Sequence, residues 1–385
     1  MASFDFDQPV ERAGSDSMKW AKYAGRDIIP LWVADMDFAA PPAVLAALRE
    51  RVEQGVFGYN QPTTAQVEAV QGYLHRHFGW QVEAEWIVWL PGLVTGINVA
   101  CRAVGDAGDA VFTATPIYPP FLGAPVDSAR RTVSAPLVRD SSGWLWDFPA
   151  VDAVLKGSRP KLMLLCHPHN PTGRVWTEDE LWQLAALAEK HDLVVCSDEI
   201  HNGLLLDPNC RHRVFATLSP ELAARSITLM APSKTFNIPG LGCAFAIISS
   251  APLRRAFQRA MHGIVPHVNA LGMAANEAAL TRCDDWQAAL CGYLRGNARA
   301  VERAVAELPG LDMRPVEATY LAWIDARDFA ADHGIAHPAK YFEDHGLGLS
   351  DGADFGAPGF VRLNFGTRRA LLDEALARLA RAVRA

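Results

Sequence analysis

The stretch MAPSKTFNIPG, from Met230 to Gly240, places a lysine directly after a buried strand that the apolar run at 226–230 predicts. Lysine is among the residues that are least often buried without a partner. We therefore expect chemistry, rather than packing, to explain why Lys234 stands at this position. The same question applies to other parts of the chain, because further polar stretches also follow apolar runs.

The composition limits the kinds of protein that this chain can be. It has 385 residues, half of them hydrophobic, which is enough for two domains. Lys and Arg total 36 and Asp and Glu total 43, so the net charge of −7 gives no reason to expect nucleic acid or an anionic membrane as a partner. No stretch is apolar enough to span a bilayer, and the acidic N-terminus lacks the pattern of an export signal, so we expect a cytoplasmic protein. The seven cysteines are scattered without a C-x-x-C pair, so we expect free thiols and no metal site.

Short apolar runs alternate with helical patterns between residues 43 and 264. Strands are predicted over 110–114, 161–166, 193–197, 227–230 and 243–248, and helices over 42–54, 92–104 and 177–191. This alternation predicts an α/β fold, with a mainly parallel sheet sandwiched by helices. The later pattern predicts a long helix over 285–308, strands over 320–325 and 359–365, and a C-terminal helix. We therefore predict a large domain over 43–282 and a smaller α+β domain formed by 1–42 and 283–385.

Four polar residues stand out, and each has a purely structural explanation when it is taken alone. Asn170 lies in the turn NPTG after an apolar strand and is compatible with an ordinary loop. Asp198 follows the next strand and could cap the element after it, although a buried carboxylate needs a partner. Lys234 could reach solvent, and Arg362 in GFVRLNF could form a structural salt bridge. In parallel sheets, however, ligands collect at the carboxyl ends of the strands.

The order of these stretches is far more specific than any one of them. Asn-Pro-x-Gly, an aspartate after a strand, Ser-Lys-x-x-Asn after a strand and an arginine in the C-terminal part resemble the fold-type I pyridoxal-phosphate (PLP) enzymes, the aspartate aminotransferase superfamily. The resemblance covers nearly the whole chain. Within it, LWVADMDF (31–38), PHNPTGRVWT (168–177), SDEIH (197–201), SKTFNIPGL (233–241) and TYLAWID (319–325) look most like the cystathionine β-lyase branch of C–S lyases.

The resemblance implies pyridoxal 5'-phosphate as the cofactor and gives each key residue a role. Lys234 would bond to the aldehyde of PLP and, once a substrate amine has freed it, would remove the proton from the substrate Cα. Asp198 would keep the pyridine nitrogen protonated, Asn170 would donate to the phenolate oxygen, and Tyr118 would stack on the ring. Arg362 would bind the substrate carboxylate bidentately.

The resemblance also implies where the phosphate and the substrate side chain lie. The amides of Leu93 and Val94 open the helix PGLVTG, whose dipole suits an anion, and Ser233 would add a hydroxyl. Tyr59 matches a family tyrosine that reaches the phosphate of the neighbouring subunit, which implies a homodimer with a shared active site. By family position, three further residues are expected near the substrate: Trp32, Asp35 and Met36.

The sequence departs from the wider superfamily at three positions. Aminotransferases usually have a tyrosine three residues after the aspartate, where this chain has His201, as the lyase branch does; its contact with the cofactor stays open. Gly242 and Ala231 stand where a phosphate-binding arginine and a serine are often found, so phosphate binding must depend on the groups named above. His167 and His169 match no catalytic position of the family and are expected to be structural.

The resemblance implies β-elimination from cystathionine or a related S-substituted cysteine, which gives a thiol, pyruvate and ammonia. An aminotransferase that exchanges an amino group with a 2-oxo acid is the nearest alternative, because both reactions begin with the same proton abstraction. A non-catalytic regulator on the same scaffold is the third. Such regulators carry an added DNA-binding domain, and here the resemblance starts near residue 5, which leaves no room for one.

Overall fold

A seven-stranded sheet forms the centre of the larger part of the protein, in a computed structural model that describes residues 4–141 and 143–385. Its strands lie in the order β2-β10-β9-β8-β7-β3-β4. All neighbouring strands are parallel except where β10 pairs with β9 and β2. The strands are β2 (Ile87–Leu90), β3 (Ala110–Thr115), β4 (Arg131–Pro136), β7 (Leu162–Cys166), β8 (Val194–Asp198), β9 (Ser226–Met230) and β10 (Ala244–Ile247). The prediction of a mainly parallel sheet is therefore confirmed.

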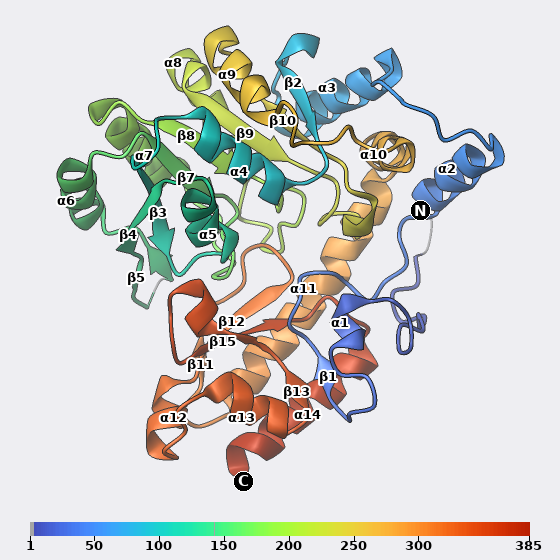
Figure 1. The fold of residues 1–385 in the computed structure, drawn as a ribbon. Coiled ribbons are helices and arrows are strands. Elements are labelled where there is room, and N and C mark those ends of the chain that lie inside the picture. Colours follow the sequence, from blue (N-terminus) through green and yellow to red (C-terminus); the bar gives the residue numbers. More distant parts are fainter. Residues whose placement is uncertain (1–3, 142) are drawn as a thin grey trace.

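Helices cover both faces of this sheet, which is why its central strands are continuous apolar runs (Figure 1). Alternate residues of β7 show the two faces. Leu162 and Leu164 belong to one buried cluster, whereas Met163 and Leu165 belong to another. The helices of this part are α4 (Leu93–Ala103), α5 (Pro120–Asp127), α6 (Phe148–Ser158), α7 (Glu178–Lys190), α8 (Pro220–Ala224) and α9 (Ala251–Met261). The N-terminus of α7 has the capping box that Thr177 and Glu180 predict.

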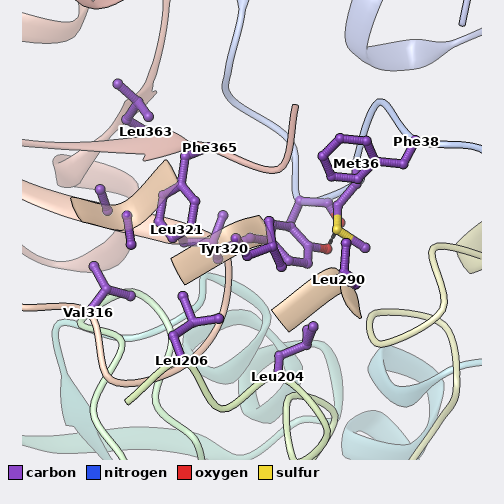
Figure 2. Close-up of a cluster of buried hydrophobic side chains, with 14 of the residues drawn as sticks. Met36, Phe38, Leu204, Leu206, Leu290, Val316, Tyr320, Leu321, Leu363 and Phe365 are labelled. Carbon is purple, nitrogen blue, oxygen red and sulfur yellow. Dashed lines mark hydrogen bonds between the residues drawn. The ribbon is translucent and has the colours of Figure 1, made fainter. Parts of the chain in front are cut away.

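A smaller antiparallel sheet lies in the C-terminal part of the chain, in the order β11-β12-β15-β14. Its strands are β11 (Asp312–Met313), β12 (Leu321–Asp325), β14 (Ser350–Asp351) and β15 (Phe360–Asn364). The helices around it are α11 (Asp284–Ala306), α12 (Arg327–Asp332), α13 (Pro338–Asp344) and α14 (Arg369–Arg384). Buried side chains from this sheet, from α11 and from the N-terminal segment pack together (Figure 2), among them Leu321, Leu363, Leu290 and Met36.

The N-terminal segment lies beside the C-terminal elements, as the blue and red ribbons in Figure 1 show. Its strand β1 (Ile29–Pro30) pairs in parallel with β13 (Leu347–Gly348), and its helix α1 spans Met18–Ala21. This arrangement agrees with the division into 43–282 and 1–42 plus 283–385, which stays a prediction because the boundaries themselves are untested. Residues 1–3 of that division lie outside the described part of the chain.

The remaining elements complete the frame. Helix α10 packs against both α2 and α3, and the helices of this group are α2 (Pro42–Glu53), α3 (Thr64–Phe78) and α10 (Ala270–Arg282). A short hairpin joins β5 (Val138–Arg139) to β6 (Trp144–Leu145). The 3-10 helices of the described residues are η1 (Ala84–Trp86), η2 (Phe215–Thr217), η3 (Pro239–Leu241) and η4 (Gly352–Phe355). Among the described residues, no helix has the length and apolar character needed to cross a membrane.

Candidate active site

A cavity of about 740 Å³ opens where the carboxyl ends of the central strands meet the smaller sheet. Its size lies in the range of small-molecule sites. Both sheets and the N-terminal segment contribute to its wall. The lining residues that matter below are Lys22, Trp32, Leu93, Val94, Tyr118, Asn170, Asp198, His201, Ser233, Lys234, Ser350, Phe355 and Arg362. The cavity therefore brings together most of the residues that the sequence singles out.

Lys234 lies in the turn that follows β9, with its amine inside the cavity wall. Its Nζ donates to the backbone oxygen of Ala34 at 2.5 Å, and the hydroxyl of Tyr320 donates to the same oxygen at 2.9 Å. Burial, followed by the charge of Arg362, lowers the pKa of Lys234 to about 8. A neutral amine is thus accessible near neutral pH, as a nucleophile or a general base requires.

Asp198 is the last residue of β8, next to Cys166 of β7 in the register of the sheet. It is buried, and its Oδ1 accepts a hydrogen bond from the amide of Ile200 at 3.1 Å. Burial raises the pKa of this carboxyl to about 7. A cation next to the carboxylate would reverse this shift, so the site favours a positively charged partner for Asp198.

Asn170 and Tyr118 come from two different loops that are held together. The amide of Tyr118 donates to the backbone oxygen of Asn170 at 3.1 Å. The side-chain oxygen of Asn170 accepts from Nη1 of Arg362 at 3.0 Å, which leaves its Nδ2 free to donate to a ligand. Burial raises the pKa of Tyr118, so its ring stays neutral in the cavity wall.

Arg362, on β15, is a buried cation whose hydrogen bonds all go to neutral groups. It is 4% exposed, and Nη2 donates to the backbone oxygen of Trp32 at 2.8 Å and to Oγ of Ser350 at 3.3 Å. Its guanidinium lies 4.7 Å from the ring centre of Phe355. Burial lowers the pKa of Arg362 to about 10. Within the described chain no carboxylate lies within 4.0 Å of this guanidinium, so the site lacks the anion that a buried arginine needs.

The N-terminus of α4 forms another part of the wall. The helix begins at Leu93 after Gly92, and no side chain caps it. The first amides of a helix have no partner within the helix. Because Leu93, Val94 and Ser233 all line the cavity, the helix amides and dipole offer a binding place for an anion such as a phosphate.

Four further predicted residues lie in different surroundings. Trp32 and His201 line the cavity, and burial lowers the pKa of His201 to about 3, so its ring is neutral. Met36 is buried in the hydrophobic core (Figure 2) and is not part of the cavity lining. Tyr59 is fully exposed between α2 and α3 and does not line the cavity of its own chain.

Asp35 takes part in ion pairs with basic side chains of the N-terminal segment. Its side chain is absent from the cavity lining. One carboxylate oxygen accepts from Nη2 of Arg12 at 2.8 Å, and the other lies 3.8 Å from Nζ of Lys19. This carboxylate is close enough to raise the pKa of Lys234. A pair of basic side chains from the preceding segment therefore holds this carboxylate, and its contact with the substrate stays a prediction.

The two histidines of the CHPHNPTG loop, His167 and His169, make their contacts outside the cavity. His167 stacks on His212 with ring centres 4.3 Å apart, and Nε2 of His169 donates to the backbone oxygen of Pro116 at 2.8 Å. Neither lines the cavity. These contacts support the structural role that their mismatch with the family predicts.

The sequence did not reveal the roles of three residues that shape the site. Tyr320 shares the oxygen of Ala34 with Lys234, Ser350 contacts Arg362, and Phe355 packs against the same guanidinium. Tyr320 was visible within TYLAWID, but its contact with Ala34 joins segments that are far apart in the chain. Ser350 lies in the two-residue strand β14 and Phe355 in the four-residue 3-10 helix η4, and both elements are too short to give a periodic signal.

Comparisons with known proteins agree with this geometry. The model of the family "Aminotransferase class I and II" matches residues 26–379. The cystathionine beta-lyase PatB of Bacillus subtilis is 35% identical, over 97% of this chain and 98% of its own. The crystal structure of OvoB is similar with a TM-score of 0.95 and 48% identity, over 99% of both chains. The PLP-bound C–S lyase of Staphylococcus hominis has a TM-score of 0.94 and 30% identity, over 99% of this chain and 98% of its own. The chain belongs to the aminotransferase class I and II family.

Proposed function

We propose that the protein is a PLP-dependent C–S lyase, which eliminates a thiol from cystathionine or another S-substituted cysteine. The observation that carries the proposal is the cavity in which Arg362, a buried cation without a carboxylate, lies together with Lys234 and Asp198. Arg362 suits the carboxylate of an amino acid, Lys234 suits the aldehyde of PLP, and Asp198 suits the ring nitrogen of PLP. The lyases among the similar proteins support the reaction type.

The residues of the cavity fit PLP group by group. The amine of Lys234, with its pKa lowered to about 8, suits an aldehyde, and the buried carboxyl of Asp198 suits a protonated ring nitrogen. The uncapped start of α4 suits a phosphate. Nδ2 of Asn170 suits the phenolate oxygen, and Tyr118 provides a ring for stacking.

Bound PLP supplies the electron sink that makes the Cα proton of an attached amino acid acidic. Each residue then has a defined task. Arg362 binds the substrate carboxylate and fixes the orientation of Cα. Asp198 holds a proton at the pyridine nitrogen, and Lys234 takes the proton from Cα.

The elimination then balances without an added oxidant. The bond between Cβ and sulfur breaks, and the sulfur keeps the electron pair and leaves as a thiolate. Water converts the remaining 2-aminoacrylate into pyruvate and ammonia. The neutral ring of His201 lines the cavity. The reaction does not require it as a general acid, because a thiol of low pKa leaves as its thiolate without much help.

The aminotransferase reaction is the alternative, since the similar proteins include aminotransferases as well as lyases and the same groups would hold the amino acid. An assay of pyruvate from L-cystathionine decides between them. Release of pyruvate with no 2-oxo acid added is the expected result. A strict requirement for a 2-oxo acid, with the amino group transferred to it, would instead establish the transaminase and refute the lyase.

We also propose that the protein acts as a homodimer whose two active sites share residues. Tyr59 is fully exposed, and the apolar side chains of Val56 and Phe57, next to it in the sequence, are exposed as well. Exposed apolar groups of this kind favour a protein interface. A tyrosine that reaches the partner's phosphate explains why Tyr59 lies outside its own cavity. The cytoplasmic location stays a prediction.

A further inference from the structure

Lys22 lies at the mouth of the same cavity that holds Arg362 at its inner end. Its Nζ is 4.8 Å from the ring centre of Trp32 and 5.0 Å from that of Tyr23. The indole is fixed in turn, because Nε1 of Trp32 donates to the backbone oxygen of Lys19 at 3.1 Å. Two aromatic faces therefore hold the ammonium group of Lys22 at the cavity rim.

Lys22 forms no salt bridge within the described residues, although its charge is one of those that lower the pKa of Glu343, a carboxylate that lines the same cavity. Throughout the described residues, no carboxylate oxygen is recorded within 4.0 Å of its Nζ. Glu343 accepts from Tyr23 at 3.0 Å and from Arg26 at 3.1 Å. The other lysine of the rim, Lys340, pairs with Asp344. Because Glu343 is held by Tyr23 and Arg26, the N–H groups of Lys22 can still donate to the carboxylate of a ligand.

Trp32 connects the two cations of the cavity. Its indole lies under Lys22, and its backbone oxygen accepts from Nη2 of Arg362 at 2.8 Å. An amino acid whose carboxylate is bound by Arg362 can therefore extend its side chain along Trp32 towards Lys22. The far end of that side chain would meet an ammonium group that forms no salt bridge within the described residues.

We propose that Lys22 binds a carboxylate at the far end of the sulfur substituent, so that S-substituted cysteines with an anionic end are the preferred substrates. This inference rests on the proposed function and names the substrate class of the same site. The opposite preference, for a cationic end, would need Glu343, Asp351 or Asp354, which also line the cavity, and Glu343 already accepts from Tyr23 and Arg26. Of these, Asp351 already accepts from the amide of Ala353 at 2.9 Å.

The test uses amino acids that bind but have no leaving group, so it does not depend on elimination. L-2-Aminopimelate carries a distal carboxylate, L-2-aminoheptanoate a methyl group and L-homolysine an amine on chains of similar length. Each is titrated into the PLP-loaded protein, and the change in cofactor absorbance gives an apparent Kd. The variants are Lys22→Met, which keeps the stem and removes the charge, Lys22→Arg, and the matched control Lys340→Met.

The unchanged protein should bind L-2-aminopimelate more tightly than L-2-aminoheptanoate. Lys22→Met should weaken only the dicarboxylate, by about three- to fivefold, the size expected for a partly exposed ion pair. Added salt should reduce the preference, and Lys22→Arg should keep it. Lys340→Met should have no effect.

Several results would overturn the inference: no preference for the dicarboxylate in the unchanged protein, tighter binding of L-homolysine, or a Lys22→Met variant that weakens all three ligands equally. A loss of preference in Lys340→Met alone would assign the role to the other lysine. The pyruvate assay stays separate, so a protein that prefers the dicarboxylate but only transaminates would refute the lyase and leave Lys22 in its role.

Discussion

Replacing Arg362 with lysine tests whether this residue binds the substrate carboxylate. A guanidinium has five N–H groups, and Arg362 makes three hydrogen bonds, to Asn170, Trp32 and Ser350, so two N–H groups remain for a ligand. A lysine ammonium has only three donors, and the same acceptors would use all of them. The variant keeps a positive charge but loses the planar pair of donors.

The size of the effect follows from this count. A hydrogen bond to a charged group contributes about 1.5–3 kcal/mol, so losing one or two while retaining the charge should cost about 2–3 kcal/mol. That corresponds to a fall of about 30- to 150-fold in kcat/KM. Because the contact exists before and during the reaction, most of the loss should appear in KM.

The assay is pyruvate release from L-cystathionine over a range of substrate concentrations, for the unchanged protein and the variant. Arg327→Lys is the matched control, since Arg327 is exposed, pairs with Asp325 and does not line the cavity. Thermal unfolding of both variants checks that the fold persists. A fall of less than about threefold in kcat/KM for Arg362→Lys, with the fold intact, would refute the assignment, since even one lost charged hydrogen bond should cost more.

Three other outcomes are expected. Lys234→Ala should lose turnover together with the absorbance of lysine-bound PLP; retained turnover in a pyruvate assay would contradict its role. Burial lowers the pKa of His169 from 6.5 to about 4, so between these pH values only the unfolded state binds this proton. The free energy of unfolding should therefore decrease by about 1.4 kcal/mol for each pH unit as the pH falls from about 6.5 to about 4. Denaturant titrations of His169→Gln should show a slope smaller by one proton, and an unchanged slope would argue against the shift. Mixed dimers of Tyr59→Ala and Lys234→Ala should recover activity that neither variant has alone; no recovery would count against a shared site.

Much of the large sheet follows from local sequence because its strands are buried on both faces. The run at 162–166 is apolar throughout, and its residues alternate between two clusters that helices cover. The polar residue at the end of such a run is then exposed to the cavity at the sheet edge. For this reason Asp198 and Lys234 could be placed near one another from the sequence, together with Asn170.

The antiparallel strand and the edge strands were harder to predict. The run at 243–248 gives β10 correctly, but an apolar run does not reveal its direction, and β10 runs against both of its neighbours. β4 lies at the edge of the sheet and is only partly buried, so it lacks the continuous apolar pattern that marked the central strands. Direction and edge position depend on tertiary packing, which local periodicity does not contain.

The N-terminal segment shows why the rest of the site was out of reach. Asp35 and Asp37 are two residues apart and equally acidic in the sequence, and both pair with Arg12, at 2.8 and 2.7 Å, yet only Asp37 is buried and accepts from Nζ of Lys19 at 2.8 Å. Lys19 is itself fully buried, so this pairing compensates the cost of burying both charges. Which carboxylate meets which cation depends on how an irregular segment crosses the smaller sheet.

The same ion pairs determine where the amine of Lys234 points. The segment that they anchor carries Ala34, whose backbone oxygen accepts from Lys234 and from Tyr320. Tyr320 in turn is buried among hydrophobic side chains of the core (Figure 2). The lysine therefore receives its orientation from Ala34 and Tyr320, which lie in the stretches LWVADMDF and TYLAWID, although neither stretch reveals that the two residues meet. A sequence can reveal which amine reacts, because burial and neighbouring strands leave a local pattern, whereas the direction of that amine depends on contacts between segments nearly 300 residues apart.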